Sequence, residues 1–222
     1  MSVFVVIPAF NEEKNICPVV RDIFSLYPDF KIIVVDDGSN DKTATMARNC
    51  GAIVLQHLIN RGQGAALKTG TDYALRLGGE IIVHYDADRQ FEPKEIGPAV
   101  AIVKKGQTEI VLGSRFLSKQ NNLPWSKKRI ILPLARLVNF LFTGRWLSDA
   151  HNGFRVLSHR AATLMDIRQD RMAHNSEIVR LIKENNLSFQ EQPITVYYHQ
   201  YGQSFGGGVK IIKDLIIGRF LR

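Results

Sequence analysis

The strongest chemical signal in the sequence is a pair of aspartates, Asp86 and Asp88, separated only by Ala87. They follow a short apolar run, so both carboxylates are expected where a buried strand ends. Two like charges at this spacing repel each other, and a bound cation relieves the repulsion. Hard divalent cations such as Mg²⁺ or Mn²⁺ bind carboxylate oxygens, and Gln90 adds an amide oxygen two residues later. The pattern favours a divalent metal site, although D-x-D pairs also occur in solvated loops.

A second acidic turn contains Asp36 and Asp37, followed by glycine and serine. A carboxylate here can accept hydrogen bonds from a base or a ribose, as the acidic residue of a dinucleotide-binding fold does. The alternative is that the turn only caps the next helix. Asp41 can serve as that cap, which leaves the two earlier aspartates without a structural role. We expect Asp37 to contact the base or ribose of a nucleotide.

A glycine-rich segment, residues 60–66, opens a predicted helix. Glycines such as Gly64 allow the backbone to approach an anion, and a helix N-terminus favours phosphate. The segment differs from the dinucleotide pattern G-x-G-x-x-G because Leu67 replaces the last glycine. A nicotinamide-dependent dehydrogenase is therefore not expected.

Short apolar strands alternate with helices through the first half of the chain. This alternation predicts an α/β fold with a mostly parallel sheet covered by helices on both faces. Such sheets bind ligands beyond the carboxyl ends of their strands, so the polar segments should meet at one edge. We expect strands at residues 3–7, 31–35, 53–55, 80–84 and 109–112, and helices at residues 13–26, 41–50, 64–77 and 93–104.

Positive charge is concentrated in the second half of the chain. The 222 residues carry 29 Lys+Arg against 21 Asp+Glu, a formal net charge of +8. Residues 115–145 contain seven basic residues and no acidic one. Within them, residues 127–143 predict an amphipathic helix with Arg129 and Arg136 on a narrow polar stripe, which is typical of a buried helix or a membrane-interface helix. We also expect a strand at 154–157, a helix at 176–184, an extended run at 189–198 and a cationic amphipathic helix at 209–222.

Several other features receive ordinary interpretations. No run reaches the roughly 18 apolar residues of a spanning helix, and no leader is recognisable, so we expect a reducing, cytosolic setting. Cys17 and Cys50 are expected to be small buried side chains. Most of the six histidines are expected at the surface or at helix caps, with His151 worth testing. Glu177 is interpreted as a first-turn helix acid rather than an acceptor contact.

The order of these motifs resembles the family 2 glycosyltransferases, and more narrowly the dolichol-phosphate mannose synthase and polyprenyl-phosphate glycosyltransferase branch. The resemblance covers nearly the whole chain. It implies a GT-A fold, a nucleotide-sugar donor, a divalent cation and inversion at the anomeric carbon. The matching segments are residues 5–13, 34–39, 60–65, 86–90 and 113–115, together with residues 149–155, where Asn152 replaces the usual serine of a D-x-x-S-G-F-R pattern.

The resemblance also implies roles for individual residues in one domain, 1–222. Residues 1–115 would hold the nucleotide sugar and metal, and residues 116–222 would form the acceptor and membrane-interface half. The expected metal ligands are Asp86, Asp88 and Gln90, and the expected catalytic residues are Asp88, Asp149 and Arg115. The residues expected at the nucleotide sugar are Pro8, Ala9, Asn11, Glu12, Asp36, Asp37, Gly64, Lys68, Asp86 and Ala87.

The acceptor can be argued from charge. A hydroxyl acceptor needs a general base, whereas a phosphate monoester with a second pKa of about 6 is already largely dianionic and needs cations. A phosphorylated lipid would explain both the basic residues and the apolar helix face. The residues expected at the acceptor phosphate are Arg115, Arg129, Arg136 and Arg155.

We therefore expect a hexosyltransferase that moves a sugar from UDP or GDP to polyprenyl or dolichyl phosphate. It would lie on the inner, cytoplasmic face of an anionic membrane, with or without a small membrane-protein partner. The alternative is a hydroxyl acceptor on a polysaccharide or glycolipid, with Asp149 as the base; Asp149 would otherwise position Arg155 or the acceptor. A nucleic-acid partner is not expected, because the acidic strand ends repel a phosphate backbone.

Overall fold

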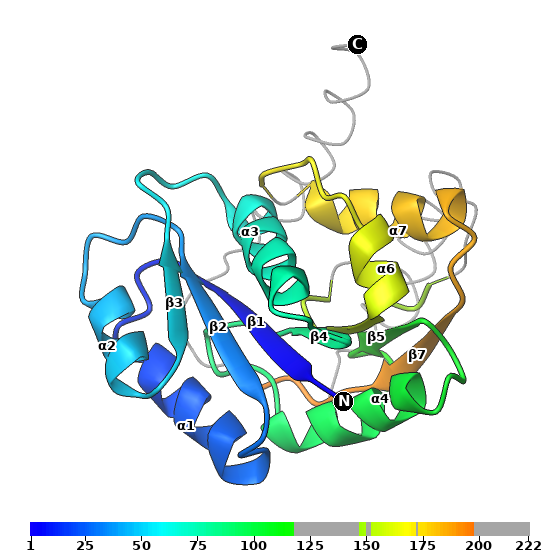
Figure 1. Cartoon of the computed structure of the whole chain (residues 1–222), viewed down its shortest axis with the longest axis horizontal. Helices are drawn as coiled ribbons and strands as arrows, with labels where there is room; N and C mark the ends of the chain where they lie inside the picture. Colours follow the sequence, from blue (N-terminus) through cyan, green and yellow to red (C-terminus); the bar gives the residue numbers. More distant parts are fainter. Residues whose placement is uncertain (118–146, 150–151, 172, 198–222) are drawn as a thin grey trace, which may run out of the picture.

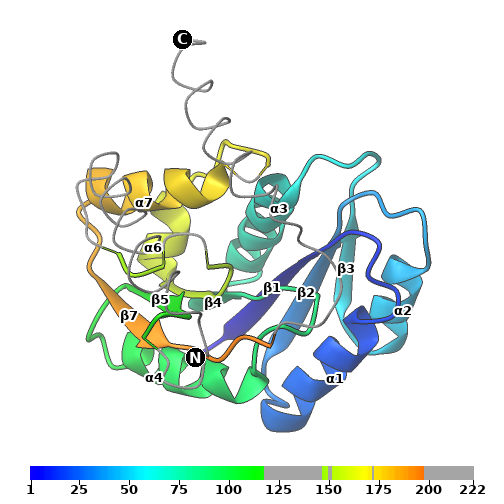
Figure 2. The ribbon, with the colours of Figure 1, turned by 180° about the vertical axis from the view of Figure 1, so that it is seen from behind.

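The computed structural model describes residues 1–117, 147–149, 152–171 and 173–197. These residues form a seven-stranded sheet in the order β3-β2-β1-β4-β6-β5-β7, with helices on both faces (Figures 1 and 2). The strands are β1 (Val3–Ala9), β2 (Lys31–Asp36), β3 (Ile53–Gln56), β4 (Ile81–His84), β5 (Ile110–Ser114), β6 (Arg155–Ser158) and β7 (Phe189–Pro193). The helices are α1 (Ile16–Leu26), α2 (Thr43–Asn49), α3 (Gln63–Arg76), α4 (Ile96–Lys104), α6 (His159–Leu164) and α7 (His174–Glu184), with a 3-10 turn η1 (Pro93–Glu95) before α4.

The predicted α/β architecture is confirmed. Every strand and helix expected in the first half is present, with ends that differ by three residues or fewer. Helix α6 was not expected, and the extended run is shorter than predicted, because β7 ends at Pro193 and only an isolated bridge joins Phe91 to Val196. The predicted amphipathic helices at 127–143 and 209–222 lie outside the described residues.

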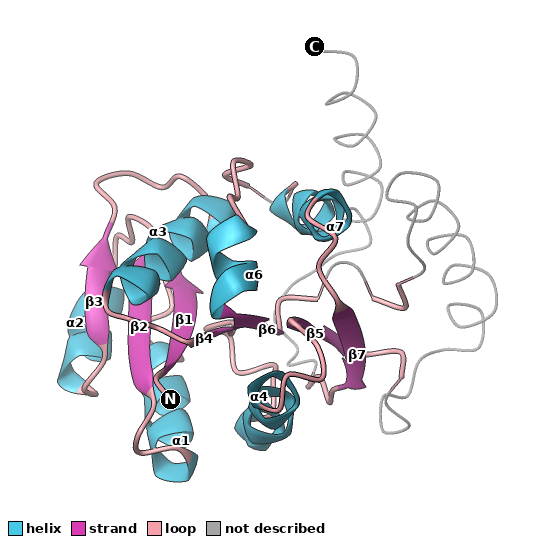
Figure 3. Cartoon of the chain, turned by 45° about the vertical axis from the view of Figure 1, so that its right-hand side comes forward, coloured by secondary structure: helices cyan, strands magenta, loops and turns pink. Residues whose placement is uncertain are grey.

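The central strands are buried on both faces, which explains their continuous apolar runs. Val5 and Ile7 of β1 join a cluster with α1, α2 and α4, whereas Phe4 and Val6 join a second cluster with α3, α6 and α7. Figure 3 shows these two groups of helices on opposite sides of the sheet. Polar side chains are therefore confined largely to the strand ends.

Strand β6 runs against its neighbours. It pairs antiparallel with both β4 and β5, whereas β1 to β4 pair in parallel. The amino end of β6 consequently lies at the same edge as the carboxyl ends of β4 and β5. This arrangement carries residues 147–154 to the edge where Asp86 and Asp88 follow β4.

The two cysteines were expected to be small buried side chains, and Cys17 is indeed buried, but the two are joined by a disulfide that was not predicted. Cys17 near the start of α1 and Cys50 just after α2 form a disulfide with a Cα–Cα distance of 5.6 Å. The pair is 33 residues apart in sequence, and such spacing alone does not indicate proximity. The bond fastens two helices that lie on the same face of the sheet (Figure 1).

Within the described residues, every helix is too short or too polar to cross a lipid bilayer.

We predict that the disulfide contributes about 3 to 4 kcal/mol to the free energy of unfolding, because it closes a 33-residue separation in the unfolded chain. The Cys17→Ser/Cys50→Ser double variant should unfold at lower denaturant than the wild type in equilibrium urea titrations. Adding a reductant should lower the wild-type midpoint to that of the variant and leave the variant unchanged. A wild-type midpoint insensitive to complete reduction would contradict this prediction.

Candidate active site

The structure brings most of the predicted polar segments to one edge of the sheet. The loops after β1, β2, β4 and β5 all begin at the carboxyl ends of parallel strands, and the segment before β6 joins them. Arg129, Arg136 and His151 lie outside the described residues, so their predicted roles stay predictions.

The Asp86 carboxylate is enclosed by two segments far apart in sequence. The side-chain amide of Gln63, the first residue of α3, donates to Oδ1 of Asp86 at 2.9 Å. On the other side, a Cβ added at Gly153 would overlap both carboxylate oxygens. Only glycine leaves room for the carboxylate at this point.

Burial raises the pKa of Asp86 to about 7, and the charge of Asp88 acts in the same direction. Arg155 and Arg115 oppose this shift without cancelling it. Burial and the neighbouring carboxylate both disfavour the ionised form of Asp86, and a bound cation would stabilise that form.

The donor set around Asp88 fits a hard divalent cation. The backbone N–H of Gln90 donates to Oδ1 of Asp88 at 3.1 Å, and the turn between them places Arg89 at a φ of 62°. Within the described ranges, no group of three or more His, Cys, Asp or Glu side chains is arranged to hold a metal. Two carboxylates and an amide oxygen suit an ion such as Mg²⁺, which commonly keeps water and substrate phosphate as its other ligands.

The loops after β1 and β2 are joined by hydrogen bonds. The backbone N–H of Asn11 donates to the Ser39 hydroxyl at 2.9 Å, and the N–H of Glu12 donates to the Thr43 hydroxyl at 2.8 Å. Burial raises the pKa of Glu12, and the nearby charge of Asp88 adds to this effect. Glu12 thus belongs to the same acidic neighbourhood as the predicted metal ligands.

Three of the small residues predicted at the nucleotide sugar are buried. Pro8 and Ala9 lie within β1, and Ala87 is 4% exposed. The side chains of Ala9 and Ala87 belong to the hydrophobic cluster beside α1 and α4. These side chains pack in the core beneath the site and are not exposed to a ligand in this structure.

Asp37 was expected to have no structural role, but it has one in the structure. Its carboxylate accepts hydrogen bonds from the backbone N–H groups of Arg61 at 3.0 Å and Gly62 at 2.6 Å, and from the His57 ring at 2.7 Å. Asp36 likewise accepts hydrogen bonds from the Ser39 N–H. Both carboxylates bind protein groups in this structure, and a nucleotide contact through them stays a prediction.

Gly64 and Lys68 also make protein contacts. A Cβ at Gly64 would overlap the carbonyl oxygen of Gln169, and the Ala65 N–H donates to the Asp170 carbonyl at 3.2 Å. The start of α3 is thus covered by residues 169–170, which corrects the idea that its glycines leave room for an anion. The Lys68 ammonium pairs with Asp72 at 3.1 Å and Asp166 at 2.9 Å.

Arg115 and Asp149 form a two-pronged ion pair across the edge. Nε and Nη2 of Arg115 donate to the Asp149 carboxylate at 2.7 and 2.8 Å, and the Arg115 backbone N–H donates at 3.1 Å. The Asn152 amide adds a fourth hydrogen bond at 3.3 Å. The Asp149 side chain is only 2% exposed, whereas that of Arg115 is 28% exposed. Asp149 therefore holds Arg115, and not Arg155, at the site.

Arg155 is 2% exposed, and its Nη2 donates to the Asn175 side chain of α7. Burial lowers its pKa to about 10, while Asp86 and Asp149 oppose the shift. Its other terminal nitrogen, Nη1, has no hydrogen-bond partner within the described part of the chain. The predicted contact of Arg155 with an acceptor phosphate stays a prediction. The burial of its side chain argues against that contact.

The expectation that most histidines lie at the surface or at caps is wrong for His57 and His84. His57 bridges Asp37 and Thr69, and His84 is fully buried with its Nε2 in a 2.9 Å hydrogen bond to the Thr71 hydroxyl. Burial lowers the pKa of His84 to about 3, with the charge of Arg155 adding to the effect. Glu177 is the first-turn acid predicted, and its buried carboxylate accepts the N–H groups of residues 168 and 169.

Sequence reasoning missed two residues that organise the site. Gln63 lies between two glycines of the glycine-rich segment, and only the glycines were considered as functional residues there. Glu191 of β7 accepts hydrogen bonds from the Ser148 N–H at 2.8 Å and the Asp149 N–H at 3.3 Å, and nothing in its own sequence neighbourhood indicates this contact. The position of Gln63 in segment 60–66 could have indicated its role, whereas no motif contains Glu191.

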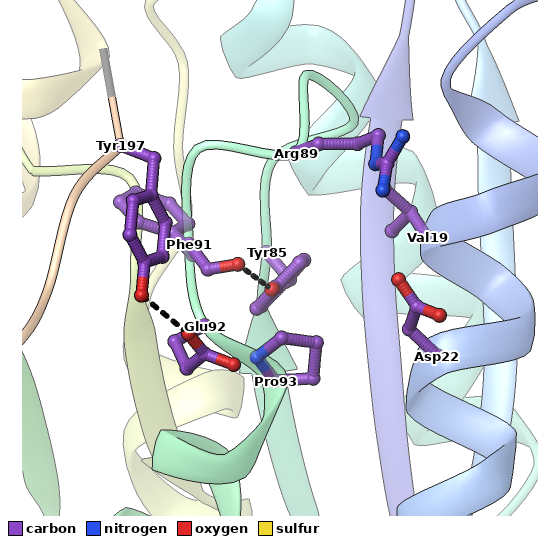
Figure 4. Close-up of a pocket in the computed structure, with 8 residues that line it drawn as sticks. All are labelled: Val19, Asp22, Tyr85, Arg89, Phe91, Glu92, Pro93 and Tyr197. Carbon is purple, nitrogen blue, oxygen red and sulfur yellow. Dashed lines mark hydrogen bonds between the residues drawn. The ribbon is translucent and has the colours of Figure 1, made fainter. Parts of the chain in front are cut away.

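A pocket of about 200 Å³ lies beside this site, between the segment after β4 and helix α1 (Figure 4). The Tyr85 hydroxyl donates to the Phe91 carbonyl at 2.7 Å, and the Tyr197 hydroxyl donates to Glu92 at 2.8 Å. Asp86 and Asp88 do not line it, so the pocket neighbours the site without containing its carboxylates. Its lining residues are Val19, Asp22, Tyr85, Arg89, Phe91, Glu92, Pro93 and Tyr197.

We predict that Gly153→Ala displaces the Asp86 carboxylate and weakens metal binding. The added methyl group should lower the free energy of unfolding by about 1 to 3 kcal/mol through overpacking and should abolish the thermal stabilisation by Mn²⁺. Gly106→Ala is the matched control: its φ of 68° makes alanine strained, by about 1 kcal/mol, but no atom lies within 4 Å of the added Cβ. Equal Mn²⁺ stabilisation of both variants would refute the role of Gly153.

Comparison with known proteins identifies the family of the chain. The model of the family described as "Glycosyl transferase family 2" matches residues 4–165. The chain is 32% identical over 230 residues to the UDP-N-acetylglucosamine--dolichyl-phosphate N-acetylglucosaminyltransferase of Methanococcus voltae, covering 94% of this chain and 91% of the relative. It is 28% identical over 217 residues to the polyprenol monophosphomannose synthase of Mycolicibacterium smegmatis, covering 93% and 82%.

A solved structure shows the same fold. Glucosyl-3-phosphoglycerate synthase of Mycobacterium tuberculosis, crystallised with Mn²⁺, UDP-glucose and phosphoglyceric acid, superposes with a TM-score of 0.71 at 20% identity, covering 97% of this chain and 77% of that one. The predicted GT-A fold is thereby confirmed, with its carboxylates and Arg115 at the edge where this fold class binds ligands. The chain belongs to glycosyl transferase family 2 and is a glycosyltransferase.

Proposed function

We propose that this enzyme transfers a sugar, with inversion, from a UDP- or GDP-sugar to a polyprenyl or dolichyl phosphate. The observation that carries the proposal is the set of hydrogen bonds that the Asp149 carboxylate accepts. Its carboxylate accepts three hydrogen bonds from Arg115 and one from Asn152, so it is poorly placed to take a proton from a hydroxyl acceptor. A phosphate acceptor needs no base, because it is already anionic near neutral pH.

The relatives support the class of acceptor. The name of the Methanococcus voltae protein specifies dolichyl phosphate as the acceptor, and that of the Mycolicibacterium smegmatis protein specifies polyprenol monophosphomannose as the product. The fold relative of Mycobacterium tuberculosis was crystallised with phosphoglyceric acid, which keeps a small hydroxyl-bearing acceptor as the alternative.

The residues of the chain divide the work as follows. Asp86 and Asp88, with the amide of Gln90, would hold the divalent cation, which when bound neutralises the diphosphate of the leaving nucleotide. Gln63 holds the Asp86 carboxylate in place. Arg115, oriented by Asp149, offers a rigid planar cation to the incoming phosphate, for which guanidinium groups are well suited.

The remaining parts of the proposal concern the membrane. Residues 1–115 would bind donor and metal, and residues 116–222, including Arg129 and Arg136, would bind the acceptor. The enzyme would lie peripherally on the inner face of an anionic membrane, with or without a small membrane-protein partner. Residues 115–145, which contain seven basic residues and no acidic one, support this placement.

We predict that Asp149→Asn lowers the transfer rate by about 100-fold, because a misplaced Arg115 costs roughly that much. If Asp149 acts through Arg115, the Arg115→Lys variant should lose a similar factor, and the double variant should lose no more than either single one. Steady-state rates and nucleotide binding of the four proteins test this. Losses that multiply in the double variant would instead support Asp149 as a general base for a hydroxyl acceptor.

We predict that the purified enzyme, given Mg²⁺ or Mn²⁺, forms an acid-labile lipid-linked sugar from polyprenyl phosphate and at least one labelled UDP- or GDP-sugar. Extraction into organic solvent and mild acid release measure the product. Asp88→Asn should fold normally and give no product. The proposal fails if no lipid-linked sugar forms while the enzyme glycosylates a soluble hydroxyl acceptor.

A further inference from the structure

Two large aliphatic side chains, Leu58 and Ile59, are exposed on the loop between β3 and α3. Figure 1 shows the course of this loop. Their exposed fractions are 102% and 70% of the reference for a free side chain. Single exposed apolar residues are common on soluble proteins. Two consecutive aliphatic side chains with this degree of exposure are less common, and they suggest a binding partner with an apolar surface.

Hydrogen bonds to a buried carboxylate hold this loop in place. Asp37 accepts the backbone N–H groups of Arg61 and Gly62 and the ring N–H of His57, which also bonds to Thr69. Because these bonds fix the residues on both sides, Leu58 and Ile59 cannot turn inward without leaving buried polar groups unpaired.

Gly38 supports the loop from below. Its φ is 75°, and a Cβ added there would lie 2.7 Å from the backbone nitrogen of Asn60 and from the carbonyl carbon of Ile59. The loop backbone therefore rests directly on the turn after β2. The exposed pair is presented by a rigid support rather than by a loose loop.

The position of the loop relates it to the active site. It follows the carboxyl end of β3, at the same edge as Asp86. Two further exposed apolar side chains stand at this edge, Phe10 after β1 with 43% and Leu117 after β5 with 44% exposure. Apolar groups on three separate loops are contacted together more readily by an extended apolar phase than by one small protein partner.

Exposed basic side chains lie on the loops at the same edge. Lys14, Lys42, Arg61 and Arg89 are exposed on the loops that follow β1, β2, β3 and β4. Arg61 lies 3.7 Å from the exposed Asp170. Basic residues at the same edge as an exposed apolar pair match the anionic headgroups and apolar interior of a lipid surface.

We propose that Leu58 and Ile59 insert into the bilayer that carries the acceptor and hold the carboxyl edge of the sheet against it. The inference rests on the proposed function, since a polyprenyl acceptor brings the active site to a membrane. It adds a second contact, in the donor half of the chain, to the membrane contact proposed for residues 116–222.

Vesicle flotation tests the proposal. The vesicles contain phosphatidylcholine and phosphatidylglycerol in equal amounts, and the variant is Leu58→Ser/Ile59→Ser. The matched control is Leu26→Ser/Leu77→Ser, which removes two aliphatic side chains of 51% and 43% exposure from the opposite edge of the sheet. The loop variant should bind at least about tenfold more weakly than the wild type, given the transfer free energy of two aliphatic side chains, and the control should bind like the wild type.

A fluorescence measurement locates the contact directly. The emission of Ile59→Trp, after subtraction of the wild-type signal, should shift to the blue with vesicles, and that of Leu77→Trp should not. The proposal is overturned if the wild type does not float, if the loop variant floats as well as the wild type, or if Ile59→Trp gives no shift. It is also overturned if the loop variant instead dissociates a dimer in vesicle-free solution, which would assign the loop to a second copy of the chain.

A vesicle-free assay separates this inference from the proposed function. With a short, water-soluble prenyl phosphate as acceptor, the loop variant should transfer sugar at the wild-type rate, because the exposed side chains of Leu58 and Ile59 are not among the residues proposed to bind donor, metal or acceptor. If the wild type forms no prenyl-linked sugar in any assay, the proposed function fails, while the flotation result still stands as a separate measurement of membrane binding.

Discussion

Both faces of the sheet are covered by helices, so strands such as β1 and β2 can place polar groups only at their ends. Six parallel strand ends and the amino end of the antiparallel β6 meet at one edge. Carboxylates crowded there cannot all remain ionised without compensation. The structure supplies that compensation with backbone N–H groups and the guanidinium group of Arg115.

Asp86 shows how this edge joins the two halves of the chain. Gln63 approaches its carboxylate from the first half and Gly153 from the second. Burial and the charge of Asp88 raise the pKa of Asp86 to about 7. The surroundings of Asp86 are therefore incomplete without the segment that precedes β6.

Two other acidic residues of the motifs stabilise the protein around the site. Asp37 fixes the loop that presents Leu58 and Ile59, and Asp149 fixes Arg115. In each case a largely buried carboxylate accepts three or more hydrogen bonds, which offsets the cost of burying its charge. Acidic residues in such motifs can thus act on the ligand through the groups they hold.

The sequence alone determined the order of strands and helices in the first half of the chain, the family, and the segments that form the edge, because apolar periodicity and motif order depend only on neighbouring residues. It did not indicate helix α6. It did not reveal the disulfide between Cys17 and Cys50, the contacts of Asp37, or the pairing of Asp149 with Arg115 rather than Arg155. These depend on which distant segments meet. Only the tertiary structure decided them. The packing of α1 beside α2 joins the cysteines, and the loop after β3 lies on the turn that contains Asp37. The insertion of the antiparallel β6 between β4 and β5 brings Asp149 to Arg115.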